Sequence, residues 1–186
     1  GVLVDTEKLY FEATRLSLSE KGIILTRVMY NQYYLQQSSG SSAILRERGF
    51  SEEEITEYRE IRNRKYAELI AGNDYSVSGA REVLESLHGR VKMCIVTSSL
   101  KEHFEIIHSK TGMLKYIDFV LAREDYRKSK PDPEPYLAAL RKSGVAPAEA
   151  IVIEDSLRGL KAARSAGLKC WVIPNEFADN NEFKDA

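Results

Sequence analysis

The sequence predicts an α/β fold, with a Rossmann-like parallel sheet as its core and an inserted α-helical cap domain. After Ser78, short β-branched runs alternate with segments of helical periodicity, which is typical of right-handed βαβ units. Between about residues 7 and 78 the pattern is helical and contains no convincing strand. We therefore predict a discontinuous α/β core of residues 1–6 and 79–186, interrupted by a helical cap of residues 7–78.

Capping signals divide the predicted cap into helices. Thr6 or Asp5 can cap the first helix, and Ser51 with Glu54 three residues later forms a capping box that opens the longest helix. The Ser/Gly composition of residues 38–42 predicts a loop. The expected cap helices cover about residues 7–21, 28–35, 43–48 and 52–71, of which the second is the least regular.

The predicted core alternates strands and helices along the rest of the chain. Pro133 at a first helical turn and Gly144 at a helix end mark one of these helices clearly. The polar residues 175–186 predict a loop or a frayed end. The expected strands cover residues 91–96, 119–121, 150–153 and 169–173, and the expected helices cover residues 80–87, 100–109, 133–142 and 157–166.

Composition and charge argue against several classes of partner. A net charge of −1 gives no electrostatic reason to expect nucleic acid or an anionic membrane. No apolar run is long enough to span a bilayer, and no signal-peptide pattern opens the sequence. Cys94 and Cys170 lie in separate apolar runs, so we expect two buried, unpaired thiols in a reducing compartment. The expected protein is a cytoplasmic monomer.

An acid pair ends one of the apolar runs. Residues 150–153 predict a strand buried on both faces, and this strand stops at Glu154 and Asp155. Because open α/β sheets bind ligands at the carboxyl ends of their strands, these carboxylates are candidate ligands of Mg²⁺. An equally good explanation, on these residues alone, is that Asp155 or Ser156 caps the following helix.

Two other segments after predicted strands carry polar side chains. Thr97 and Ser98 follow the run that ends at Val96, and they can offer a hydroxyl and free N–H groups to an anion. Lys130 lies in the segment 129–133, where two prolines restrict the direction of the backbone. Taken singly, each has a plainer explanation: an N-cap for the serine and a solvated loop for the lysine.

These three clusters occur in a fixed order and resemble the motifs of the haloacid dehalogenase superfamily. Thr97 is similar to its second motif, Lys130 in Ser-Lys-Pro-Asp-Pro to its third, and Glu154-Asp155-Ser to its fourth. Residues 1–7 resemble the second half of its first motif. The helical insert resembles the small cap of the branch that contains β-phosphoglucomutase and phosphoglycolate phosphatase.

The resemblance implies phosphoryl transfer through an aspartyl-phosphate, with Mg²⁺ as the cofactor. In that scheme Thr97 Oγ and the Ser98 N–H bind phosphate oxygens, and Lys130 neutralises charge on the nucleophile and on the phosphoryl group. Asp155 binds Mg²⁺ directly and Glu154 binds it through a water molecule. Thr97 and Lys130 are therefore the candidate catalytic residues.

One departure from the family pattern concerns the start of the sequence. In the family, the nucleophilic aspartate and the acid/base aspartate both precede the motif glycine, which is Gly1 here. The strand that carries them is therefore outside the sequence. We expect the nucleophile to be encoded upstream of Gly1, and we expect the 186-residue chain by itself to have no hydrolase turnover.

The resemblance favours a phosphatase that acts on a small, soluble phosphorylated metabolite. A sugar-phosphate mutase is the alternative, because the cap decides whether water or a second substrate hydroxyl reaches the intermediate. Arg62, on the longest cap helix, is a candidate for binding a distal substrate group, although an exposed basic helix face explains it equally well. The loop of residues 36–41 is expected to face the site. A further alternative is a binding module without a nucleophile.

Overall fold

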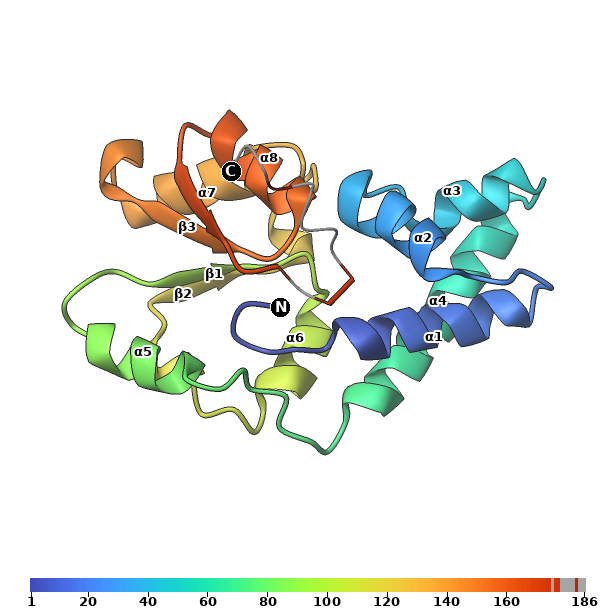
Figure 1. Cartoon of the computed structure of the whole chain (residues 1–186), viewed down its shortest axis with the longest axis horizontal. Coiled ribbons are helices and arrows are strands. Elements are labelled where there is room, and N and C mark those ends of the chain that lie inside the picture. The colour runs from blue at the N-terminus through green and yellow to red at the C-terminus, as the bar shows by residue number, and fades with distance from the viewer. Residues whose placement is uncertain (175, 178–182, 184–186) are drawn as a thin grey trace.

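The computed structural model describes residues 1–174, 176, 177 and 183, arranged in two lobes (Figure 1). The predicted terminal loop of residues 175–186 lies mostly outside these described residues. The cap lobe contains α1 (Glu7–Ser19), α2 (Arg27–Tyr30), the π-helix η1 (Asn31–Gln36), α3 (Gly40–Glu47) and α4 (Glu52–Ile70). The core lobe contains β1 (Cys94–Val96), β2 (Phe119–Leu121), β3 (Ile151–Glu154) and β4 (Lys169–Val172), with α5 (Ala80–Leu87), α6 (Lys101–His108), α7 (Glu134–Ser143) and α8 (Leu157–Ser165).

The alternation of strands and helices in the core lobe confirms the predicted α/β class with an inserted helical cap. Short 3₁₀ helices, η2 (Leu114–Tyr116), η3 (Arg123–Asp125) and η4 (Pro147–Glu149), lie in the connections. The chain crosses between the lobes twice, and the two crossing segments run side by side. Val4 and Ser76 form an antiparallel bridge, flanked by hydrogen bonds from Asp5 N to Tyr75 O and from Val77 N to Leu3 O, both 2.9 Å. The division of the chain at residues 6 and 78 stays a prediction.

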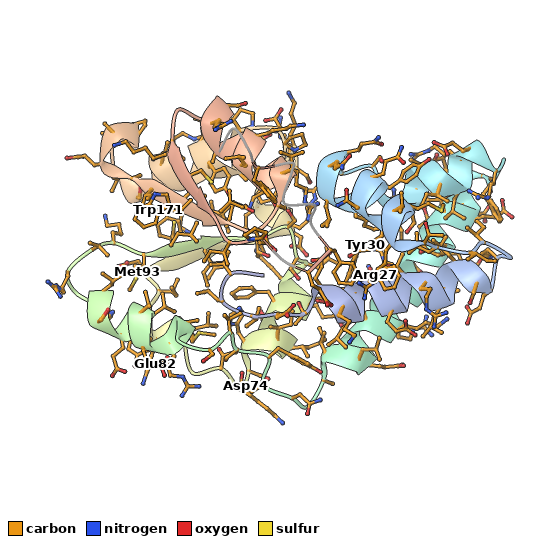
Figure 2. All side chains as sticks on the ribbon, viewed as in Figure 1. Arg27, Tyr30, Asp74, Glu82, Met93 and Trp171 are labelled. Atoms are coloured by element: carbon orange, nitrogen blue, oxygen red, sulfur yellow. The ribbon has the colours of Figure 1, made fainter. Side chains whose placement is uncertain are left out.

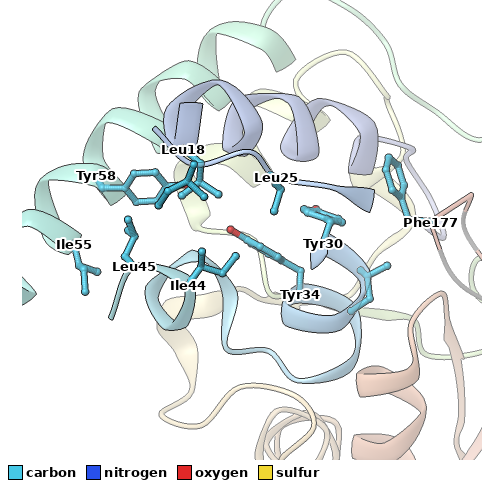
Figure 3. Close-up of a cluster of buried hydrophobic side chains, with 11 residues drawn as sticks. Leu18, Leu25, Tyr30, Tyr34, Ile44, Leu45, Ile55, Tyr58 and Phe177 are labelled. Carbon is cyan, nitrogen blue, oxygen red and sulfur yellow. The ribbon is translucent and has the colours of Figure 1, made fainter. Parts of the chain in front are cut away.

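The cap lobe has a hydrophobic core, which Phe177 from the segment after β4 also enters (Figure 3). Tyr30 is fully buried there and stacks on Tyr34 with ring centroids 4.6 Å apart. Burial of large apolar side chains between helices is the main source of their stability, because isolated short helices are marginal in water. The buried members of this cluster are Leu18, Ile23, Leu25, Tyr30, Tyr34, Leu35, Ile44, Leu45, Ile55, Tyr58 and Phe177.

Local signals in the cap were partly misleading. The capping box is confirmed, since Ser51 Oγ accepts from Glu54 N and Glu54 Oε2 accepts from Ser51 N. The predicted loop at residues 38–42 is wrong in its second half, because α3 already begins at Gly40. Thr6 occupies the N-cap position of α1 without capping it, since its hydroxyl instead accepts a hydrogen bond from Tyr66. Tertiary packing therefore outweighed local composition.

The strands form two parallel pairs rather than one continuous sheet. β1 pairs with β2 in the register Cys94↔Phe119, and β3 pairs with β4 in the register Ile151↔Lys169. Within the described residues no backbone ladder joins the two pairs. Helices α5 and α6 lie on one side of the strands, and α7 and α8 lie on the other (Figure 1). The first predicted strand is also shorter than expected, since it starts at residue 94 rather than 91.

The prediction that the strand of residues 150–153 is buried on both faces is wrong. Val152 and Cys170 pack against α8, but Ile151 and Ile153 are 48% and 44% exposed. Successive strand residues point to opposite faces, so helices that cover one face leave alternate residues open. Trp171 of β4, labelled in Figure 2, is 67% exposed.

Cys94 and Cys170 are both free thiols, as predicted. The predicted burial of Cys94 is wrong, because this residue is exposed to solvent. Cys170 is only partly buried. Among the described residues, no helix is both long enough and apolar enough to cross a bilayer.

The capping box provides a test of how far α4 depends on its first turn. Ser51→Ala should lower the free energy of unfolding by about 1 kcal/mol, because the Glu54 N–H at the helix start loses the Ser51 hydroxyl that accepts from it. Urea unfolding followed by circular dichroism measures this difference. Thr56→Ala is the matched control, since Thr56 is exposed in the same helix and its hydroxyl donates to Glu52 O within that helix. An unchanged unfolding midpoint for Ser51→Ala would contradict the role of the cap.

Candidate active site

A buried ion pair joins two segments that follow different strands. Lys130 Nζ lies 2.5 Å from Glu154 Oε1, and the two side chains are 7% and 6% exposed. The same ammonium donates to the carbonyl oxygen of Val96, the last residue of β1, at 3.0 Å. It also lies 4.8 Å from the ring centroid of Tyr136. Lys130 therefore places a positive charge between the carboxyl ends of β1 and β3.

The Glu154 carboxylate is surrounded by hydrogen-bond donors. Its Oε1 accepts from Lys130 Nζ and from the Tyr136 hydroxyl, both at 2.5 Å. Its Oε2 accepts from the backbone N of Asp155 and from Ser156 Oγ, both at 3.1 Å. Burial alone would raise the pKa of Glu154, but the Lys130 charge and these hydrogen bonds outweigh it and lower the pKa. Glu154 is therefore an ionised partner of Lys130, and both of its oxygens are occupied.

The turn into α8 brings the backbone close to this carboxylate. Ser156 caps the helix, with its hydroxyl accepting from Gly159 N at 3.2 Å. A Cβ atom at Gly159 would overlap the carboxylate of Glu154, so the position needs a glycine for space. Sequence reasoning missed Gly159 and Tyr136. Gly159 could have been predicted from the spacing Glu-Asp-Ser-x-x-Gly, which places it in the first turn of the helix after the acid pair. Tyr136 lies in α7, and no local pattern in the sequence predicts its contact with Glu154.

Thr97 and Ser98 lie directly beyond Val96, next to the Lys130 ammonium. Both residues are partly buried, and Thr97 Oγ1 accepts from Ser99 N at 3.1 Å. The hydroxyl of Tyr126 donates to Thr97 O at 2.8 Å and fixes the turn after β1. The threonine oxygen is thus a hydrogen-bonded, positioned group at the end of a strand.

Asp155 occupies the corresponding position after β3. Its Oδ2 lies 3.1 Å from the ammonium of Gly1, and its side chain is 18% exposed. A Cβ atom at Gly1 would overlap the Asp155 carboxylate, which shows how closely the two backbone segments approach. The start of the described chain therefore reaches the same end of the strands as Thr97 and Lys130.

The described residues do not by themselves make a magnesium site. They contain no group of three or more His, Cys, Asp or Glu side chains placed to hold a metal ion. Both Glu154 oxygens accept hydrogen bonds, and Asp155 Oδ2 lies 3.1 Å from the nitrogen of Gly1. Mg²⁺ takes six oxygen ligands in octahedral geometry, so the Asp155 carboxylate by itself would bind it weakly. The assignment of Asp155 and Glu154 as metal ligands stays a prediction, and the Glu154 oxygens already accept from donors of the protein.

Arg62 lies apart from the strand ends, in the cap lobe. Its guanidinium donates to Asn63 Oδ1 at 2.7 and 3.2 Å and stands 5.2 Å from the ring centroid of Tyr10. Among the described residues, no hydrogen bond or ion pair connects it to Thr97, Lys130 or Asp155.

Two other residues of the cap lobe lie near the strand ends, and one of them, Ser38, bonds to a strand-end segment. Ser38, in the loop predicted to face the site, donates from Oγ to the carbonyl oxygen of Lys130 at 2.6 Å. Glu7, at the start of α1, accepts from the Tyr30 hydroxyl at 2.5 Å. Burial raises the pKa of Glu7, against the lowering effect of the Tyr30 hydrogen bond, and the charge of Asp155 raises it further. Sequence reasoning placed Glu7 in a motif but gave it no role.

The chain resembles known proteins along most of its length. Residues 1–173 match the family model described as haloacid dehalogenase-like hydrolase. A phosphorylated carbohydrates phosphatase of Thermotoga maritima is 32% identical over 175 residues, covering 91% of this chain and 79% of that protein. The putative phosphatase YhcW of Bacillus subtilis is 26% identical over 192 residues, covering 100% of this chain and 84% of that protein.

Solved structures share the fold. CbbY from Rhodobacter sphaeroides, in complex with phosphate, superposes with a TM-score of 0.83 at 24% identity, covering 100% of this chain and 88% of that one. A β-phosphoglucomutase from Clostridium difficile gives a TM-score of 0.84 at 23% identity, covering 100% and 84%. The family match over residues 1–173 includes both lobes and all three strand-end clusters. The chain therefore belongs to the haloacid dehalogenase-like hydrolases, in the branch that contains phosphoglycolate phosphatase and β-phosphoglucomutase.

Proposed function

We propose that this chain is the main part of a phosphatase that hydrolyses a small phosphorylated metabolite. The observation that carries the proposal is the buried Lys130 ammonium, fixed between the ends of β1 and β3 beside Thr97. A positive charge held in place and shielded from water stabilises the charge that develops on a transferring phosphoryl group. The names of the relatives from Thermotoga maritima and Bacillus subtilis support hydrolysis, and the first of them favours a sugar phosphate.

In the proposed site, each residue has one task. The Thr97 hydroxyl and the Ser98 N–H bind oxygens of the phosphoryl group. Lys130 neutralises its charge, and Glu154 holds Lys130 in position through the 2.5 Å contact. Arg62 belongs to the cap of residues 7–78, where it binds a distal group of the substrate after the lobes adjust.

We propose that the attacking group is an aspartate encoded upstream of Gly1, which forms an aspartyl-phosphate. Support comes from two of the carboxylates around the site, which already have partners: Glu7 accepts from Tyr30, and Glu154 is paired with Lys130. A carboxylate that is engaged in this way is a poor nucleophile. Gly1 lies against Asp155, so a segment that precedes it would enter the site directly.

We also propose that the activity depends on Mg²⁺, with Asp155 as the ligand that residues 1–186 supply. The ion would neutralise charge on the phosphoryl oxygens. Further oxygen ligands would come from the same upstream segment, because the Glu154 oxygens are occupied by donors.

A phosphoester screen tests the proposed activity. Phosphate release is measured with Mg²⁺ for phosphoglycolate, hexose phosphates and β-glucose 1-phosphate, using the 186-residue chain and a form extended upstream of Gly1. We expect release by the extended form and none by the 186-residue chain. Conversion of β-glucose 1-phosphate to glucose 6-phosphate without phosphate release would instead identify a mutase. Binding without turnover by the extended form would identify a binding module.

Lys130→Ala in the extended form should lower kcat on the best substrate by on the order of 10²-fold, because a buried charge that stabilises the transition state is lost. Steady-state kinetics measures this effect. Lys128→Ala is the matched control, since Lys128 lies in the same loop with its side chain 73% exposed and should leave kcat unchanged. A nearly normal rate for Lys130→Ala would remove Lys130 from the site.

Asp155→Asn should raise the Mg²⁺ concentration needed for half-maximal activity by about 10-fold or more, because a charged oxygen ligand becomes a neutral one. Activity is titrated with MgCl₂ at a saturating substrate concentration. Asp118→Asn is the control, since Asp118 precedes β2 at the amino end of the strands and Asn still accepts from Met93 N. An unchanged Mg²⁺ dependence would mean that Asp155 only shapes the turn before α8.

A further inference from the structure

The loop that follows η1 contacts the core lobe through Ser38. Ser38 Oγ donates to the carbonyl oxygen of Lys130 at 2.6 Å, across 92 residues of sequence. Ser38 therefore bonds to the backbone of Lys130, whose side chain carries the buried ammonium. A hydrogen bond of this length between two lobes orders both of the segments that it joins.

The backbone of Ser38 is unusual. Its φ is +59°, in the left-handed region that residues other than glycine rarely adopt. It comes two residues after a π-helix, a feature that is frequent at functional sites. Such backbone geometry persists only where surrounding contacts impose it, and at Ser38 the contacts come from the core lobe.

Arg158 approaches the same hydroxyl from the core side. Its Nη1 lies 3.4 Å from Ser38 Oγ, and its Nε is buried without a hydrogen-bond partner among the described residues. Arg158 lies at the start of α8, three residues after Asp155. One serine hydroxyl of the cap lobe thus meets both core segments that carry the proposed site, the Lys130 loop and the first turn of α8.

Lys130 is consequently fixed from two directions. Its ammonium is held inside the core lobe by Glu154 and Val96 O, whereas its carbonyl is held by Ser38 of the cap lobe. We propose that Ser38 is a positioning residue that couples closure of the cap lobe to the placement of Lys130. The catalytic part of this inference rests on the proposed function, because it takes Lys130 as the group that acts on the phosphoryl group.

Hydrogen–deuterium exchange tests the coupling without any need for activity. In Ser38→Ala, the backbone amide of Asp132, which donates to Ser129 O at 3.0 Å, should exchange about 5-fold faster than in the unaltered chain, because the loop loses its contact with the cap lobe. Ser38→Gly should behave in the same way. Glycine accepts the positive φ without strain, so this variant separates loss of the hydroxyl from backbone distortion.

The control is Ser39→Ala, because Ser39 Oγ donates to Tyr33 O and Gln37 Oε1 within the cap lobe. It should leave exchange at residues 129–132 unchanged. Unchanged exchange there in Ser38→Ala, or normal exchange in Ser38→Gly, would overturn the proposal. Faster exchange spread evenly through the cap lobe would also overturn it, since it would show a role in folding rather than in coupling.

Kinetics of the extended form supply the second readout. Ser38→Ala and Ser38→Gly should lower kcat by about 5- to 10-fold and change KM by less than about 2-fold, because a positioning contact acts mainly in the transition state. Normal kcat in both variants, with faster exchange, would overturn the catalytic coupling. If the unaltered extended form shows no turnover, the proposed function fails, and the exchange experiment still decides whether Ser38 links the two lobes.

Discussion

The contact between the Lys130 ammonium and the Glu154 carboxylate connects parts of the core lobe that the backbone leaves separate. The two strand pairs share no ladder within the described residues, yet Lys130 reaches the last carbonyl of β1 and the last side chain of β3 at once. Removing two charges from water is costly, and the pair is favourable only when further donors satisfy the carboxylate. Tyr136 and Ser156 are two of those donors. The ion pair is therefore stable because a whole set of polar groups surrounds it.

This requirement explains several residues whose individual roles look unrelated. Gly159 leaves room for the Glu154 carboxylate, and the Ser156 hydroxyl both donates to it and caps α8. Tyr136 covers the ammonium with its ring and donates its hydroxyl to Glu154. A change at any one of them leaves a buried charge with fewer partners, so the positions are coupled rather than additive.

The positions of the charged groups along the chain were predictable, but their partners were not. Lys130, Glu154 and Asp155 stand after apolar runs, and the rule that parallel strands present ligands at their carboxyl ends places them on one edge. Tyr136 could not be found in this way, because a tyrosine on a helix gives no local sign of what it will contact. The exposure of Ile153 was also missed, since an apolar run does not reveal that helices cover only one of its faces.

The contacts between the lobes differ in kind, because some are backbone pairs, some are buried apolar contacts and some are single side-chain hydrogen bonds. Phe177, from the segment after β4, is buried in the core of the cap lobe, and its carbonyl oxygen accepts from Asn31 Nδ2 at 2.9 Å. At the crossing segments, residues 3–5 pair with residues 75–77 through their backbones. Nearby, the His103 ring of α6 forms a hydrogen bond with Asn63 O of α4 at 3.2 Å. At the strand ends, Ser38 makes one short and one long hydrogen bond. Single hydrogen bonds between two segments open at lower free energy than a buried apolar cluster does. The Ser38 bonds are therefore the contacts through which a small change in the cap lobe reaches the Lys130 loop, whereas the crossing segments and Phe177 keep the lobes joined elsewhere.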